Sequence, residues 1–307
     1  MVSRAHRFPK TLTTMKRLIL ILLAFAGGLL LSVFLDRLGV IPSDSVKPPL
    51  SQQPAPAPDA SPTLADLAAG KLQLVDLSWP LNRESAYWPG DEYRPFELHT
   101  IATLEKDGVL SKAFSSPEHL GTHLDAPNHF EAGKPSVDQI PPGNLFGPGV
   151  VIDVSGPVSA DADYLISLTD VKKFESEHKQ IPAGAIVLAN TGWAKFWKEP
   201  DRYQGRDVRD RLHFPGFAPE AVEFLIKERS VRGVGLDTLS VDHGLSRDFP
   251  VHHLLGKAER FGLENLAQLD KLPPSGFYVF VAPIKIETGS GGPARVFAIL
   301  PNRGGEN

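Results

Sequence analysis

The sequence predicts a mixed α and β domain built on a central sheet that other layers cover. Short runs rich in β-branched and aromatic residues recur along the chain with turns between them, which is the pattern of strands. Two of the runs, AIVLAN and YVFVAP, are apolar on both faces, as in strands that are buried from both sides. These observations indicate an α/β fold with a covered sheet. The predicted strands occupy residues 72–79, 149–154, 185–191, 233–238, 278–286 and 294–300.

Two helices are predicted between these strands, from Leu168 to His178 and from Pro219 to Arg229. Proline suits the first turn of a helix because the backbone N–H that it lacks would have no partner there. The second helix carries an apolar stripe at helical spacing, which consists of Ala221, Val222, Leu225 and Ile226. The order and the direction of the strands do not follow from these patterns.

The composition narrows the classes of function. The chain has 307 residues, of which 42% are hydrophobic and 22% are charged, so it can form a large core. A formal net charge of -4 provides no broad basic surface, which argues against nucleic acid and for a small-molecule substrate. The chain contains no cysteine, which excludes disulfides and thiolate ligands. Any transition-metal site must therefore be built from His, Asp and Glu.

The N-terminal region predicts a membrane anchor. Residues 1–17 form a basic segment, and the apolar run that follows from Leu18 to Leu35 is close to the lower length limit for a spanning helix, about 17 to 25 residues. Residues 18–41 are therefore predicted to be a transmembrane helix, with residues 1–17 in the cytoplasm and the remainder outside, in the periplasm if the protein is bacterial. A cleaved secretory signal is the alternative, because Ala24-Phe25-Ala26 resembles a cleavage site.

A linker separates this region from the folded domain. Residues 42–62 are rich in Pro, Ser and Ala and almost lack large apolar residues, a composition that favours extended conformations over a packed core. Residues 63–307 then form one predicted domain, since the strand and helix patterns lie there and no internal repeat divides it.

One segment concentrates groups that can bind metal. The sequence EHLGTHLDAPNHF contains His119, His123, Asp125 and His129 within eleven residues. Gly121 and Pro127 disfavour a helix here. In an extended strand the four odd-numbered side chains would project to one face, while Leu120 and Leu124, with Phe130 as a further candidate, face the core.

A straight strand would spread these four side chains over about 30 Å, so the chain must bend, and Gly121 and Pro127 permit it to bend. We predict that His119, His123 and Asp125 bind a divalent metal with an open position for water, the arrangement of catalytic metal sites. His129 is predicted to act outside the ligand shell as general acid or base. The alternative is that the histidines are structural or surface residues that lie close together by chance.

The same segment resembles the signature of the metal-dependent cyclase family, the family of kynurenine formamidases and isatin hydrolases. The motif H-x-G-T-H-x-D-x-P-x-H is present from His119 to His129, and further similarity runs from about Val75 to Leu300. The resemblance implies a swivelling β/β/α fold, assembly as a homodimer or homotetramer, and hydrolysis of an amide or cyclic amide. It also implies one or two zinc ions, or a single manganese, and a second metal held by His252 and Glu264.

The resemblance suggests residues that contact the substrate as well. Trp88, in YWPGD, matches a family position that contacts an aromatic substrate, although a core tryptophan beside a turn would also fit. His213 and Phe214, in HFPG, line the pocket or pack a loop. Asp237 and Asp242 are candidates to orient a ligating histidine. The predicted membrane anchor departs from the family pattern and leaves the substrate open.

The predicted function is hydrolysis of a C–N bond by metal-activated water, as in an arylformamidase. An isatin hydrolase-like or lactonase-like activity on another cyclic substrate is the alternative within the same fold. Two classes without catalysis also remain, an exported metal-binding module and an anchored interaction protein whose Pro-rich segment is functional.

Overall fold

A mixed sheet of eight strands forms the centre of the protein. The computed structural model describes residues 62–302, and the strand order is β1-β12-β11-β5-β7-β9-β10-β4. Because β4 also pairs with β12, the sheet closes on itself into a barrel. The strands are β1 (Leu72–Asp76), β4 (His123–Asp125), β5 (Phe146–Asp153), β7 (Ile186–Asn190), β9 (Gly233–Leu236), β10 (Phe261–Glu264), β11 (Phe277–Pro283) and β12 (Gly291–Pro301).

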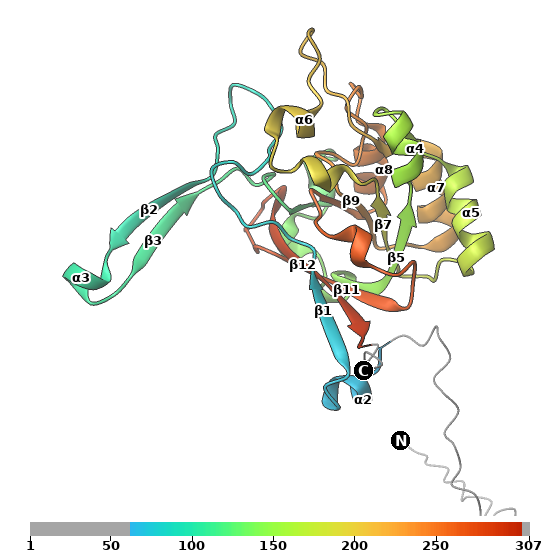
Figure 1. Ribbon diagram of the computed structural model, residues 1–307, viewed down its shortest axis with the longest axis horizontal. Helices are drawn as coiled ribbons and strands as arrows, with labels where there is room; N and C mark the ends of the chain where they lie inside the picture. The colour runs from blue at the N-terminus through green and yellow to red at the C-terminus, as the bar shows by residue number, and fades with distance from the viewer. Residues whose placement is uncertain (1–61, 303–307) are drawn as a thin grey trace, which may run out of the picture. The chain divides into compact units, whose positions relative to one another are not determined.

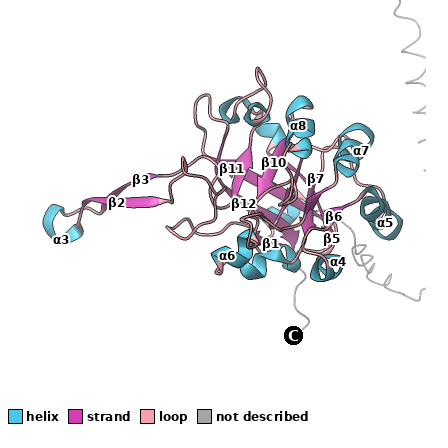
Figure 2. Cartoon of the chain, turned by 90° about the horizontal axis from the view of Figure 1, so that it is seen from above, coloured by secondary structure: helices cyan, strands magenta, loops and turns pink. Residues whose placement is uncertain are grey.

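Half of the sheet is parallel, and helices cover its outer face. Strands β5, β7, β9 and β10 run parallel to one another, whereas β4, β11, β12 and β1 pair antiparallel with their neighbours. Figure 1 shows the helices to one side of the parallel strands, and the view from above agrees (Figure 2). These helices are α4 (Ser155–Ala160), α5 (Leu168–His178), α7 (Pro219–Arg229) and α8 (Pro250–Lys257).

Two hydrophobic cores lie on the two faces of this sheet. On β5, Val150 and Ile152 face the helices and pack with side chains of α5 and α7. Val151 faces the interior of the barrel and packs with residues of the antiparallel strands, including Val279 and Val296. Alternate residues of one strand thus enter separate cores, which explains why the predicted strands are apolar on both faces.

A hairpin projects from this body. Strands β2 (Glu97–Ala102) and β3 (Ser111–Ser115) pair antiparallel, and helix α3 (Leu104–Asp107) lies at the tip (Figure 1). The remaining elements are small: α2 (Leu64–Ala68), α6 (Pro200–Gln204), the strand pair β6 (Leu165–Ile166) and β8 (Gly216–Phe217), and the 3₁₀ turns η1 (Pro127–His129), η2 (Val137–Gln139), η3 (Pro142–Asn144), η4 (Trp193–Phe196) and η5 (Leu269–Lys271).

The metal-binding segment is less regular than the extended strand that the sequence predicts. Only residues 123–125 are a strand. Gly121 adopts a left-handed conformation with φ 62°, and Pro127 begins the turn η1, so the chain bends at the two predicted positions. Leu120 and Leu124 are fully buried, as predicted. The prediction that His129 lies on the same strand face is wrong, because the 3₁₀ turn redirects the chain after Ala126.

No helix within residues 62–302 is long and apolar enough to cross a bilayer. The predicted basic segment, the predicted anchor and all but the last residue of the predicted linker lie within residues 1–61, outside the described residues.

We expect Leu124, which points into the barrel and is fully buried, to stabilise the packing of strand β4. Replacement of this side chain by alanine should lower the free energy of unfolding by about 2–5 kcal/mol, the usual cost of a buried Leu→Ala change. Urea denaturation measures it. Leu74→Ala on β1 is the matched control, since Leu74 is 64% exposed, and should change stability by about 0.5 kcal/mol or less. Equal effects of the two substitutions would contradict the stabilising role of Leu124 in the core.

Candidate metal centre

Strands β4 and β10 bring two predicted ligands face to face. The strands are antiparallel, and His123 lies directly opposite Glu264 in their register. Residues in such a pair project to the same face of the sheet. His123 Nε2 is therefore 3.3 Å from a carboxylate oxygen of Glu264, and it is also 3.3 Å from Asp125 Oδ1. All three side chains are buried.

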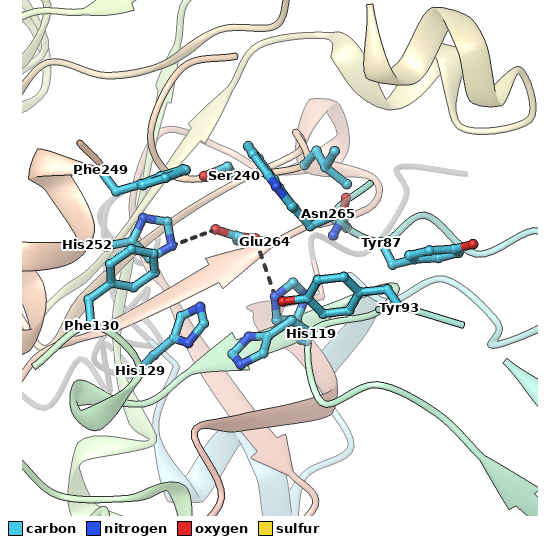
Figure 3. A pocket seen from close by; sticks show the side chains of 13 residues that line it. Tyr87, Tyr93, His119, His129, Phe130, Ser240, Phe249, His252, Glu264 and Asn265 are labelled. Carbon is cyan, nitrogen blue, oxygen red and sulfur yellow. Dashed lines mark ion pairs between the residues drawn. The ribbon is translucent and has the colours of Figure 1, made fainter. Parts of the chain in front are cut away.

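Helix α8 adds His252 to this group. Pro250 begins the helix, and His252 lies in its first turn. Its Nε2 atom is 3.3 Å from the second carboxylate oxygen of Glu264 and 3.5 Å from Asp125 Oδ2. Figure 3 shows Glu264 pointing toward His252, with a dashed line for this ion pair. The family resemblance implied that His252 and Glu264 belong together, and the structure brings them together.

His119 and His129 lie on the other side of Asp125. His119 Nδ1 is 2.6 Å from Asp125 Oδ1, and the ring of His129 stacks on that of His119 with 3.8 Å between the ring centroids. His119, Asp125 and His129 each offer a ligand atom within 4.8 Å of the others, and so do His123, Asp125 and Glu264. Asp125 is common to both groups, and these residues would hold any cation bound at this centre.

Hydrogen bonds on the outer nitrogens fix how the histidines face this centre. His123 Nδ1 is 2.9 Å from the carbonyl oxygen of Gly121, so Nδ1 donates to it. His252 Nδ1 is 2.7 Å from Asp242 Oδ2. With these nitrogens occupied, both rings direct the lone pair of Nε2 inward, which is the arrangement that metal-ligating histidines use.

Two buried atoms at the centre are left without a hydrogen bond. They are His123 Nε2 and Asp125 Oδ2. Buried polar atoms almost always have a partner, so such atoms among imidazoles and carboxylates indicate a place for a cation. The donor set of imidazoles and carboxylates around Asp125 therefore fits a divalent metal.

Charge and burial act strongly on the protonation of these groups in the metal-free chain. Burial alone would lower the pKa of His123, but the charges of Asp125 and Glu264 outweigh it and raise the pKa to about 10. Burial also opposes the charged form of His252, yet hydrogen bonds to Asp125, Asp242 and Glu264 raise its pKa well above the usual value. Burial lowers the pKa of His129 to about 3. In the metal-free chain, the negative charge of Asp125 and Glu264 thus keeps His123 and His252 protonated. A bound cation would balance this charge in place of the protons.

An aromatic cavity opens onto this centre. It has a volume of about 190 Å³, and its floor includes His119, His123, His129, His252 and Glu264. Five aromatic side chains line it, namely Tyr87, Trp88, Tyr93, Phe130 and Phe249, and all of them except Trp88 are labelled in Figure 3. The Trp88 ring contacts Phe249 edge-on at 5.5 Å between centroids. A flat, aromatic small molecule would fit beside the metal ligands in such a cavity.

Of the residues that the resemblance assigned to the substrate, some line the cavity and others do not. Trp88 lines the cavity. Phe214 is fully buried behind it, with 6.5 Å between the two ring centroids. His213 lies outside the cavity lining, and its Nδ1 atom is 2.8 Å from Asp163. Phe130 lies on the cavity wall, 4.3 Å from the His252 ring, instead of in the core.

The two candidates for orienting a histidine also differ. Asp242 accepts the hydrogen bond from His252, as expected of such a residue. Asp237 instead accepts bonds from the backbone of Thr191 and Ala194 and contacts no histidine of the centre. Phe249 and Tyr93 were not found from the sequence, because isolated aromatic residues in loops have no periodic pattern that marks them.

We predict that the metal-free chain becomes less stable as the pH rises from 6.5 toward 10. A histidine whose pKa is raised in the folded state, as for His123, stabilises that state below its unfolded pKa of 6.5, and this contribution is lost as the pH approaches about 10. Urea denaturation in EDTA measures the slope. His123→Gln should reduce it, whereas His178→Gln, at an exposed site, should not.

The zinc-loaded chain should behave in the opposite way through the neutral range, because imidazoles must lose their protons to bind metal. A metal-free chain whose stability is constant or rises between pH 6.5 and 10 would contradict the raised pKa values.

Comparisons with known proteins agree with this geometry. The profile of a family described as "Putative cyclase" matches residues 75–243. Isatin hydrolase from Roseibium aggregatum is 34% identical over 77% of this chain and 95% of its own length. Kynurenine formamidase from Bacillus cytotoxicus is 29% identical over 72% and 94%. The solved structure of isatin hydrolase A from Ralstonia solanacearum superposes with a TM-score of 0.73 at 36% identity, and covers 80% of this chain and 100% of that one. The chain belongs to the cyclase family.

Proposed function

We propose that the protein is a metal-dependent hydrolase that opens the amide bond of a small aromatic cyclic amide of the isatin type. One observation carries this proposal, the convergence of buried imidazoles and carboxylates on the floor of an aromatic cavity. Isatin hydrolase, which resembles nearly the whole described domain, supports the substrate class. An N-formyl aryl amide is the second candidate, because a kynurenine formamidase also covers 72% of the chain.

The residues of the centre suggest a division of roles. A divalent cation held by these donors would polarise the amide carbonyl and lower the pKa of a bound water. His129 lines the cavity and its ring stacks on that of His119, so we assign it the transfer of the proton from the attacking water. The water oxygen bonds to the carbonyl carbon, the C–N bond breaks, and His129 returns the proton to the leaving nitrogen.

The aromatic walls would orient the substrate. Trp88 and Phe249 offer ring faces and edges against which an aryl group can pack, while the cavity floor positions the amide over the metal ligands. Zinc or manganese suits a donor set of imidazoles and carboxylates. We further propose that the N-terminal segment holds this domain outside the cytoplasm, on the basis of the sequence of residues 1–41 alone.

The direct test is metal-dependent turnover. The purified full-length chain, loaded with Zn²⁺ or Mn²⁺, should open isatin, as followed by loss of its visible absorbance, and EDTA should abolish the reaction until metal is restored. N-formylkynurenine is assayed in parallel. Faster turnover of N-formylkynurenine would replace the isatin-type assignment, and hydrolysis of neither by the metal-loaded chain would refute both.

A second test concerns His129. His129→Ala should reduce kcat by about 10²–10⁴-fold, the usual contribution of a general acid or base, while the chain keeps its metal. Metal content is measured beside kcat, since His129 also lies within ligand distance of Asp125 and His119. His253→Ala is the control, because His253 is the neighbouring histidine of His252 and pairs with Glu131 at a half-exposed site. Loss of metal together with kcat would assign His129 as a ligand instead.

A further inference from the structure

The pairing of β4 with β10 explains the position of His123, and helix α8 explains that of His252. His119 is held instead by a hydrogen bond to a residue that is distant in sequence. Its Nε2 atom is 2.8 Å from Ser290 Oγ, which lies 171 residues later in the chain. The hydroxyl of Ser290 is in turn 2.6 Å from Glu118 Oε2. Glu118 directly precedes His119 in sequence, so two adjacent residues contact the same serine hydroxyl.

The direction of these hydrogen bonds follows from counting protons. The backbone N–H of Ser290 donates to Glu118 Oε2 at 2.9 Å, so that oxygen is an acceptor. A serine hydroxyl has one proton, and the short contact to the same carboxylate oxygen takes it. The lone pairs of Ser290 Oγ are then left to accept a proton from His119 Nε2. In the metal-free chain Nδ1 donates to Asp125 Oδ1 at 2.6 Å, and a cation beside Asp125 would replace this proton and use the Nδ1 lone pair.

The chain around Ser290 is built to approach His119 closely. A side chain on Gly291 would place its Cβ 2.6 Å from His119 Cε1, and one on Gly289 would place it 2.8 Å from Glu118 Oε1. Real Cβ atoms do not come so close to other atoms, and the Cβ on Gly291 would also lie 2.5 Å from the backbone oxygen of Leu124, so position 291 admits only glycine without a shift of the chain. The carbonyl oxygen of Ser290 also accepts from the backbone N–H of Ala126, next to Asp125.

We propose that Glu118 and Ser290 are positioning residues that hold His119 with its proton on Nε2 and its Nδ1 lone pair directed at the metal position beside Asp125. This inference rests on the proposed function, since it concerns the same centre. The local sequence does not mark this role, because Ser290 is remote from the motif and meets Glu118 and His119 only in the folded chain.

The affinity for Zn²⁺ tests this proposal. In the full-length chain, Ser290→Ala should raise the Kd of one bound zinc about 10- to 100-fold, the usual effect of removing a partner that orients a ligand, as measured by competition with a chromophoric chelator. Ser290→Thr keeps the hydroxyl and should restore the affinity. Asp138→Ala is the matched control, because Asp138 holds the same loop through the backbone N–H of Thr288 but does not touch His119.

Two outcomes would overturn the proposal. One is an unchanged Kd in Ser290→Ala, and the other is an equal loss in Asp138→Ala, which would assign the effect to order in the loop. A second measurement does not depend on a variant that folds: in the zinc-loaded chain labelled with ¹⁵N-histidine, NMR should find the His119 proton on Nε2, and a proton on Nδ1 would refute the inference.

The proposed function and the positioning role of Glu118 and Ser290 can be refuted independently of each other. A chain that binds zinc, loses affinity in Ser290→Ala and yet hydrolyses no amide would refute the proposed function and support the positioning role. If the chain hydrolyses isatin but binds zinc equally well with and without the Ser290→Ala substitution, the proposed function is supported and the positioning role is refuted.

Discussion

The need to balance the buried charge of Asp125 organises the centre of this protein. A buried carboxylate without a partner costs several kcal/mol, and Glu264 adds a second one nearby. Protons on His123 and His252 can offset this cost in the metal-free chain, which is why the pKa values of both are raised. A divalent cation offsets it more completely, because it can contact several donors at once while the imidazoles remain neutral. Metal affinity and the stability of the barrel are therefore coupled through the same few atoms.

The closure of the barrel places Asp125 where this balance can be reached. Strand β4 is only three residues long, yet it pairs with β10 on one side and with β12 on the other. The pairing with β10 supplies Glu264, and the pairing with β12 brings Ser290 beside His119. Strand β4 thus gathers ligands that are far apart in sequence, and its one inward residue, Leu124, ties the centre to the hydrophobic core.

Predictions from the sequence were correct where they rested on a pattern of neighbouring residues. Helices α5 and α7 match their predicted bounds, because periodic apolar residues and terminal signals define them. The histidine motif also identified the bend at Gly121 and the cluster around Asp125. The β2–β3 hairpin was missed, since its exposed strands lack the alternation that burial imposes, and Ser290 was missed because only the barrel closure brings it near His119. Contacts of this kind depend on pairing across the sheet, which single-sequence patterns do not contain.

Strain at Phe249 shows how the cavity is joined to the metal centre. This residue adopts a left-handed conformation with φ 45° immediately before Pro250, a combination that costs about 1–3 kcal/mol for a residue with a side chain. Its ring packs against Trp88 and Phe130, and its backbone N–H donates to Ser246 Oγ. The same turn starts helix α8 three residues before His252, so a relaxed backbone at Phe249 would move both an aromatic wall and a ligand. The turn at Phe249 therefore joins an aromatic wall of the cavity to the start of the helix that carries His252.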